Sequence, residues 1–222
     1  TAKIYLEEDR FVLENGKQLL GKIDLFYDEN GEQGYIQTNK WPLFDENHNV
    51  VGIFGMSRNI TEQLIEQELL KEREEKISLL LNSTAEGIYG IDLNGNCTFV
   101  NKSCVSILGF DSEEEFLGKN MHDLIHHSYE NKTYMDVKVC KILQAFHKGE
   151  GVHVDDEVFW KKDGTCFPVE YYSYPQIKNE EIIGAVITFN NITERKAIEE
   201  QLFKYAKDLK ILNSDKDKFI RI

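Results

Sequence analysis

The chain has 222 residues, of which 41% are hydrophobic and 29% are charged, as in an ordinary globular protein with one or two domains. Acidic residues outnumber basic ones 39 to 26, and the formal net charge is −13. Nucleic acids and anionic membrane surfaces are bound mainly through Lys and Arg, so this charge argues against both as partners.

The first part of the chain, residues 1–62, predicts one short helix and a small antiparallel meander. The helix covers about Tyr5 to Asn15, and three strand-like segments follow it. Asn30-Gly31 marks a hairpin turn because Gly tolerates a positive φ angle, and the polar segment 45–49 marks the next turn. So few elements, in about 60 residues, bury too little apolar surface for us to expect stability in isolation.

A connecting helix is predicted at 63–82. Its Leu and Ile positions are interrupted by the all-charged segment 71–76. That interruption breaks the hydrophobic seam that a continuous coiled coil needs. We therefore interpret this segment as a linker.

Residues 83–196 predict a complete α+β unit. A hairpin around Asn94-Gly95 opens it, helical segments follow from about Lys102 to Lys148, and an Asp163-Gly164 turn lies in a second set of strands. We expect one five-stranded antiparallel sheet with a helical crossover. Its strands are predicted near 87–92, 97–101, 154–161, 166–176 and 182–191.

The two parts share an internal repeat. The segment 51–62, ending in Asn-Ile-Thr-Glu, recurs at 183–194, which is 132 residues later. The upstream Gly turns match as well, with one residue gained between them. The first part therefore corresponds to the carboxy-terminal half of the second.

The last segment, 197–222, predicts a helix with a hydrophobic seam. Apolar residues step by 4, 3, 4 and 3, which is the heptad pattern of a parallel coiled coil. This pattern favours a homodimer over a helix that lies on its own domain. The seam consists of Ile198, Leu202, Tyr205, Leu209 and Leu212.

Location is indicated by what the sequence lacks. No apolar run approaches the roughly 20 residues of a membrane span, and no signal peptide opens the chain. The cysteines have no CxxC spacing, so we expect reduced thiols in a cytoplasmic protein with no direct membrane insertion by this segment. They are Cys97, Cys104, Cys140 and Cys166.

These motifs together resemble the PAS sensor family. The hairpin with Asp92-Leu93-Asn94-Gly95, the segment Leu108-Gly109-Phe110, the turn Lys162-Asp163-Gly164-Thr165 and the closing Asn191-Ile192-Thr193-Glu194 are similar to the family's motifs. The resemblance implies a complete PAS domain at 83–196 and the carboxy-terminal part of a preceding PAS domain at 1–62.

The resemblance also implies a relay between the sheet and the last helix. The family usually ends in Asp-Ile-Thr, whose carboxylate can bind a basic partner, but Asn59 and Asn191 stand in the two copies here and bring no charge. We expect the relay at Asn191, Thr193 and Glu194, with the Thr193 hydroxyl capping the helix and Glu194 in its first turn.

The tail from Leu209 to Ile222 is similar to the lead-in to the phosphoacceptor helix of sensor histidine kinases. Neither a phosphoacceptor His nor an ATP-binding domain is recognisable in this sequence. We therefore expect no enzymatic activity from this chain. The full-length parent resembles a protein histidine kinase, which implies a kinase core downstream in the same polypeptide.

Sensory PAS domains bind small molecules between the sheet and the crossover. The apolar residues there could line such a cavity or form plain core, and we favour core. Flavin photoreceptors of this family place an adduct-forming Cys where this chain has Met121, which argues against a light-driven adduct. The cavity candidates are Met121, Leu124, Ile125, Leu143, Phe146, Phe159, Tyr171 and Phe189.

Weak candidates for metal ligands are His122, His126 and Cys140 in the crossover. The i, i+4 spacing puts both histidines on one side of a helix, and His and Cys ligate transition metals and haem iron. We favour solvated or hydrogen-bonded histidines, with metal or haem ligation and a pH-responsive cluster as alternatives. The sequence leaves the cofactor open, with none at all among the alternatives.

The sequence as a whole predicts the sensory and signal-relay region of a two-component sensor histidine kinase. In this hypothesis the PAS domain responds to a small ligand or an upstream change and transmits it through a dimeric helix. One alternative is a ligand-free PAS dimerisation and linker module. The other is a haem- or metal-binding redox or gas sensor.

Overall fold

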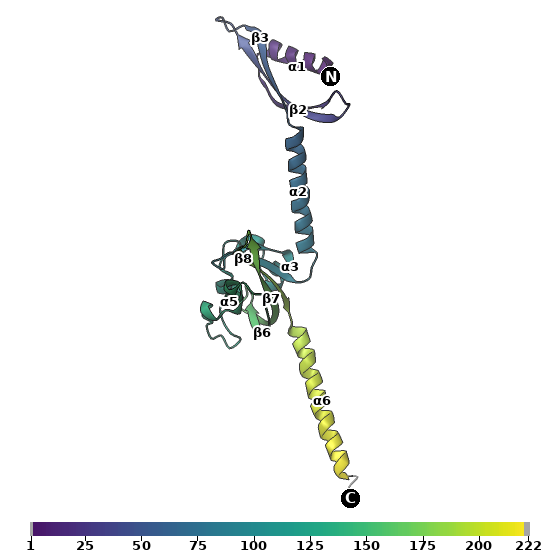
Figure 1. Ribbon diagram of the computed structural model, residues 1–222, viewed down its shortest axis with the longest axis vertical. Helices are drawn as coiled ribbons and strands as arrows, with labels where there is room; N and C mark the ends of the chain where they lie inside the picture. The colour runs from purple at the N-terminus through teal and green to yellow at the C-terminus, as the bar shows by residue number, and fades with distance from the viewer. Residues whose placement is uncertain (1, 220–222) are drawn as a thin grey trace. The chain divides into compact units, whose positions relative to one another are not determined.

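The computed structural model describes the backbone of residues 2–219 and the side chains of residues 5–144 and 148–210. The chain forms two compact units, Thr1–Lys76 and Ile77–Ile222 (Figure 1). No helix within the described residues is both long and apolar enough to cross a membrane.

The first unit contains the predicted helix and meander. Helix α1 (Ala2–Asn15) is followed by strands β1 (Leu19–Tyr27), β2 (Gln33–Phe44) and β3 (Val50–Asn59), which pair antiparallel in the order β1-β2-β3. In each hairpin turn one Asp carboxylate, Asp28 or Asp45, accepts hydrogen bonds from the backbone of the following residues. The turns thus form where the sequence pattern places them.

Buried ion pairs join α1 to this sheet. The carboxylate of Glu8 contacts Lys22 of β1 and lies 2.9 Å from Nζ of Lys40 on β2. Lys40 also binds Asp9, at 2.6 Å. The Glu8 side chain and Lys40 are each less than a tenth exposed, so the charges satisfy one another where water cannot.

Helix α2 (Thr61–Asn82) follows β3 directly, and none of its residues is buried. Its charged middle segment, 71–76, is exposed, as expected for a linker.

The second unit has the predicted five-stranded antiparallel sheet. Every strand lies within two residues of its predicted bounds, and the order is β5-β4-β8-β7-β6. Gly184 allows β8 to approach β4 closely, because a Cβ atom there would lie 2.0 Å from the carbonyl oxygen of Ile91. The strands are β4 (Gly87–Ile91), β5 (Cys97–Val100), β6 (Val152–Trp160), β7 (Cys166–Lys178) and β8 (Glu181–Asn191).

The crossover between β5 and β6 packs against this sheet, and the core lies between the two. Among the predicted cavity candidates, the side chains of Ile125, Phe159, Tyr171 and Phe189 are fully buried in that core, where the Phe159 and Tyr171 rings stack. The crossover consists of α3 (Lys102–Leu108), η1 (Glu113–Glu115), α4 (Met121–Ile125), η2 (Val137–Val139) and α5 (Lys141–Lys148).

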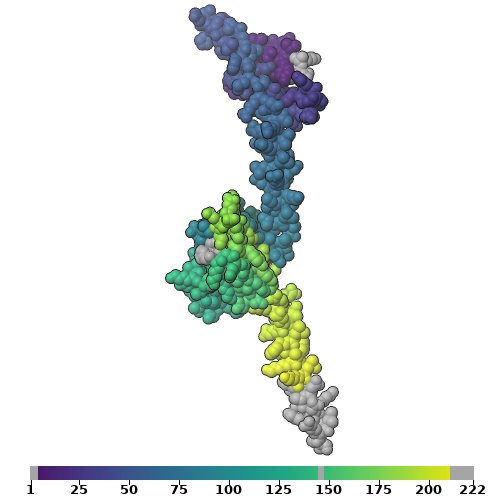
Figure 2. Space-filling view, viewed as in Figure 1, coloured from purple at the N-terminus to yellow at the C-terminus, as the bar shows by residue number. Residues whose placement is uncertain are grey.

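Helix α6 (Thr193–Phe219) leaves the sheet at the end of β8. Figure 2 shows the described part of α6 as an extended arm of the second unit. The seam side chains Ile198, Leu202, Tyr205 and Leu209 are all more than half exposed in this single chain. The Leu212 side chain, also predicted for the seam, lies outside the described residues. The helix therefore presents an apolar stripe that its own domain leaves uncovered.

Candidate functional site

Two buried histidines lie on the short helix α4. The side-chain oxygen of Asn120 accepts hydrogen bonds from the backbone of His122 and Asp123, which starts the helix. The His126 N–H donates to the His122 carbonyl at 3.0 Å and closes the single turn. The predicted i, i+4 relation is thereby confirmed, and both rings emerge on the same side.

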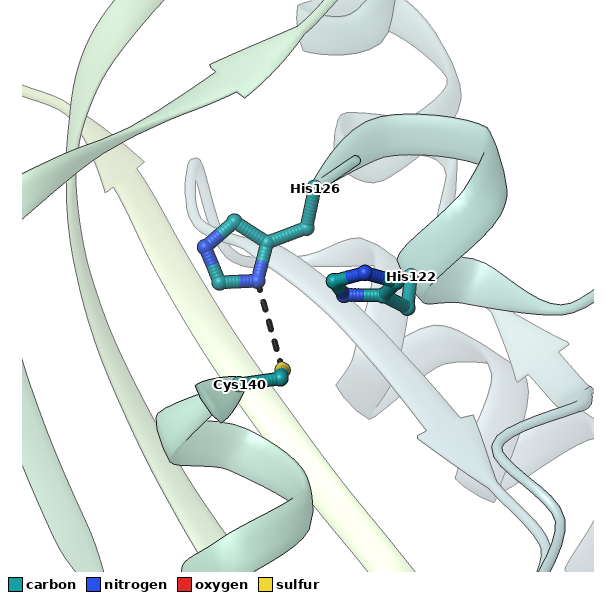
Figure 3. Close-up of side chains that lie close together, drawn as sticks. All are labelled: His122, His126 and Cys140. Atoms are coloured by element: carbon teal, nitrogen blue, oxygen red, sulfur yellow. Dashed lines mark hydrogen bonds between the residues drawn. The ribbon is translucent and has the colours of Figure 1, made fainter. Parts of the chain in front are cut away.

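Cys140 completes a cluster with these histidines. It lies between η2 and α5, and its Sγ is 3.5 Å from Nδ1 of His126 (Figure 3). The candidate ligand atoms of the three residues lie within 4.8 Å of one another. His122 is 5% exposed, and His126 and Cys140 are each 1% exposed. Of the favoured expectation, solvated or hydrogen-bonded histidines, this pair fits the hydrogen-bonded form, because both rings are buried and each has a hydrogen-bond partner.

The Nε2 atom of each histidine ring contacts a further group. Nε2 of His122 is 2.9 Å from the carbonyl oxygen of Met135. Nε2 of His126 is 2.9 Å from Oε2 of Glu157, as an ion-pair contact rather than an aligned hydrogen bond. Glu157 also accepts a 2.7 Å hydrogen bond from the Tyr171 hydroxyl and pairs with Lys141 at 3.1 Å.

Sequence reasoning missed Glu157. It follows Asp155 and Asp156, and nothing in its type separates it from those exposed neighbours. The register of β6 against β7 shifts between Val154 and Glu157. Such a bulge inserts residues into the strand and re-aims the side chain that follows, so Glu157 points to the cluster.

The electrostatics of the cluster favour charged forms. Burial alone would raise the pKa of Cys140, but the neighbouring His122 and His126 lower it to about 6. Burial likewise opposes a charged His126, yet Cys140 and Glu157 raise its pKa to about 9. By contrast, burial raises the pKa of Cys97, which has no such partner, to about 11. The site can thus hold a thiolate in a protein interior.

The cluster borders a small cavity of about 10 Å³. Pockets for drug-sized ligands occupy roughly 300–1,000 Å³, whereas about 10–15 Å³ suffices for one water molecule. The cavity therefore has room for an ion or a water and not for haem or flavin. It is lined by Tyr89, Ile91, Gly95, Met121, His122, His126, Cys140, Ile142 and Leu143.

Of the predicted cavity residues whose side chains the structure describes, Met121 and Leu143 line this cavity. Leu124 is partly buried and packs against the core, and the Phe146 side chain lies outside the described residues. An open groove of about 470 Å³ lies beyond the cluster, bordered by Met135, Glu157 and acidic neighbours.

The junction of β8 and α6 differs in detail from the expected cap. The helix begins at Thr193, and the side-chain oxygen of Asn191 accepts from the Thr193 backbone N–H at 3.0 Å and from its hydroxyl at 2.6 Å. Thr193 therefore donates its hydroxyl proton to Asn191 instead of capping the helix itself. Glu194 lies in the first turn, as expected.

An ion pair fastens the first turn of α6 to the sheet. Arg195 lies 2.9 Å from the Glu170 carboxylate on β7. Glu170 also contacts His153 of β6, at 3.0 Å. Asn191 brings no charge to this junction, and Arg195 and Glu170 supply the ion pair instead.

Comparison with known proteins identifies the family to which this fold belongs. The family described as the PAS fold matches residues 75–192, which is more than half of the chain. The chain belongs to the PAS family. Sporulation kinase A of Bacillus subtilis (strain 168) is 23% identical to it over 144 residues, covering 64% of this chain and 22% of that kinase. The chain thus spans about a fifth of that relative's length.

Solved PAS domains are among the structures to which this chain is similar. The PAS domain of an HTR-like protein from Haloarcula marismortui is 20% identical, with a TM-score of 0.47, covering 57% of this chain and 98% of its own. A PAS domain from a two-component sensor histidine kinase is 15% identical, with a TM-score of 0.42, covering 55% and 97%.

Proposed function

We propose that this chain is the sensory and signal-relay region of a two-component sensor histidine kinase. A change at the crossover cluster is transmitted through the sheet into α6 and on to a kinase core in the same polypeptide. The relation to Sporulation kinase A over its PAS-like part supports the link to kinases.

One observation on β7 carries the proposal. Tyr171 bonds to Glu157 and so senses the crossover cluster, while its neighbour Glu170 binds Arg195 on α6. Successive side chains of a strand point to opposite faces of the sheet. Two adjacent residues therefore connect the cluster on one face with the first turn of the output helix on the other.

The connection from β8 to α6 supports the same route. Tyr171 pairs with Phe189, and Val169 pairs with Asn191. Only Ile192 separates the end of β8 from the start of α6, and its backbone N–H donates to the Pro168 carbonyl. A joint this short transmits a shift of the strands to the helix.

The proposal includes a homodimer and a cytoplasmic location. The exposed apolar stripe of α6 suits a parallel coiled coil, which would bring two kinase cores together. The four cysteines are free, in keeping with a reducing compartment. The alternative of a ligand-free linker module would use the same helix without any response at the crossover.

The test removes the Tyr171 hydroxyl, which connects the crossover cluster to β7. In the full parent polypeptide, Tyr171→Phe takes away only the bond to Glu157, and Tyr172→Phe is the matched control on the opposite, more exposed face. We expect Tyr171→Phe to change regulated autophosphorylation, at a stability cost of about 1 kcal/mol. Equal autophosphorylation in Tyr171→Phe, Tyr172→Phe and the wild type, in every signalling state, would refute the relay.

A further inference from the structure

The crossover cluster has an unsatisfied polar atom at its centre. Nδ1 of His122 is buried and has no hydrogen-bond partner among the described residues. Buried polar atoms are nearly always paired, so an unpaired one points to a missing ligand or ion. This atom belongs to a residue whose ligand atom lies within 4.8 Å of those of His126 and Cys140.

The groups behind the rings decide which nitrogens are free. A backbone carbonyl can only accept, so Nε2 of His122 carries the proton that faces Met135. Nε2 of His126 faces a carboxylate oxygen of Glu157 and carries its proton for the same reason. In a neutral ring this leaves a bare lone pair on Nδ1 of each histidine.

Without a metal, one proton shared between Nδ1 of His126 and Sγ of Cys140 leaves Nδ1 of His122 without a partner in the described part of the chain. A metal ion satisfies all three at once. A histidine that ligates a metal commonly donates its other N–H to a carboxylate or a backbone carbonyl, which are the groups found here. The 3.5 Å between Sγ of Cys140 and Nδ1 of His126 also equals the separation of about 3.5 Å that tetrahedral zinc imposes, from bonds of about 2.3 and 2.0 Å.

We propose that His122, His126 and Cys140 bind one transition metal ion of the zinc class, through two imidazole Nδ1 atoms and one thiolate. The proton that Cys140 and His126 share passes to solvent as the metal–sulfur bond forms. The small cavity beside the cluster supplies the fourth coordination position, with room for one water. Three protein ligands and one open position describe a site that exchanges ligands, unlike a closed structural zinc site.

The surface next to the cluster is acidic. The open groove beyond Glu157 is bordered by Glu130, which attracts positive charge, and by Asp156, which pairs with Lys141. Glu157 borders both this groove and the cluster. The metal site rests on the proposed function and deepens it, because metal occupancy would be the signal that Glu157 and Tyr171 pass to the sheet.

The test is a titration of the purified chain with Co²⁺, which takes zinc sites and reports thiolate ligation by a sulfur-to-cobalt charge-transfer band. We expect one Co²⁺ per chain, that band, and its loss when Zn²⁺ is added in competition. Absence of a thiolate band in the wild-type chain, or binding only at the surface with no sulfur signal, would overturn the proposal without any variant.

Variants then locate the ion. We expect Cys140→Ser to abolish the band and Cys166→Ser, which alters a cysteine outside the cluster, to preserve it. Glu157→Gln should weaken binding by about 10–100-fold, as for other groups behind a ligating histidine. An unchanged band in Cys140→Ser would overturn the assignment. Because no kinase is involved, a negative titration leaves the relay intact, and a failed relay in the kinase assay leaves the titration unaffected.

Discussion

Asn101 provides the sharpest test of how the PAS domain holds its amino-terminal elements together. Its side chain is 1% exposed and accepts hydrogen bonds from the backbone N–H groups of Ile88, at 2.9 Å, and Cys104, at 2.8 Å. It also donates to the carbonyls of Leu81 and Glu86. One residue thus joins the end of α2 to β4 and α3.

The variant Asn101→Ala removes every one of these bonds. The N–H groups of Ile88 and Cys104 are deep enough to exclude water, and an unsatisfied buried donor costs about 1–3 kcal/mol. We therefore expect a loss of roughly 3 kcal/mol in the free energy of unfolding of the second unit. At about 2–4 °C per kcal/mol for a domain of this size, the thermal midpoint should fall by roughly 6–12 °C.

The assay follows Trp160, the only Trp of the second unit, in a Trp41→Phe background. Urea unfolding gives the free energy, and a thermal scan gives the midpoint. The control is Asn94→Ala, an exposed turn position where a change within about 0.5 kcal/mol is expected. A loss below about 1 kcal/mol for Asn101→Ala would show that other groups or water replace its hydrogen bonds and that Asn101 does not hold these elements together.

Two further predictions concern the helix and the first unit. Leu209→Asp places a charge on the seam of α6 and should shift the mass measured by light scattering toward that of the monomer. The control Lys207→Asp, which lies off the seam, should leave the mass unchanged. Equal masses for the two variants would show that α6 does not form the dimer. Burial opposes ionisation of Glu8, but hydrogen bonds from lysines lower its pKa below the ordinary 4.5, so its contribution is present above that pH and is lost as pH falls through the lowered value. Glu8→Gln should therefore reduce the loss of stability that the first unit shows as the pH falls, measured by Trp41 fluorescence. An unchanged dependence on acid pH would show that other groups cause the loss.

The fold was predictable because its signals are local. Each strand is bounded by Gly, Asp or Asn turns, and the repeat of 51–62 at 183–194 fixed the order of the meander in both copies. The i, i+4 relation of His122 and His126 is likewise local, and the structure confirms it. Cys140 was named only as a weak candidate, since the 14 residues that separate it from His126 give no geometric constraint.

What the sequence did not reveal depends on register and packing. Glu157 faces the cluster only because β6 carries a bulge, and the latch joins Arg195 to Glu170 across 25 residues of sequence. The small volume of the cavity follows from aromatic side chains that fill the core, and no periodicity reports that volume. From the sequence, Asn191 was compared with the Asp of the family motif, and only the missing charge was considered. The side-chain oxygen of Asn191 is still an acceptor, and it binds Thr193 at the start of the helix.

We propose that the sheet controls α6 through the contact of Glu170 with Arg195, and a charge swap perturbs that contact specifically. Both side chains are partly exposed, so the pair contributes only about 0.2–1 kcal/mol to stability and either single variant should fold. The measurement is autophosphorylation of the full parent polypeptide in each signalling state. We predict that Glu170→Arg and Arg195→Glu each alter the regulated activity and that the double variant moves it back toward the wild type. Single variants that keep wild-type regulation in every state would show that this contact does not control α6.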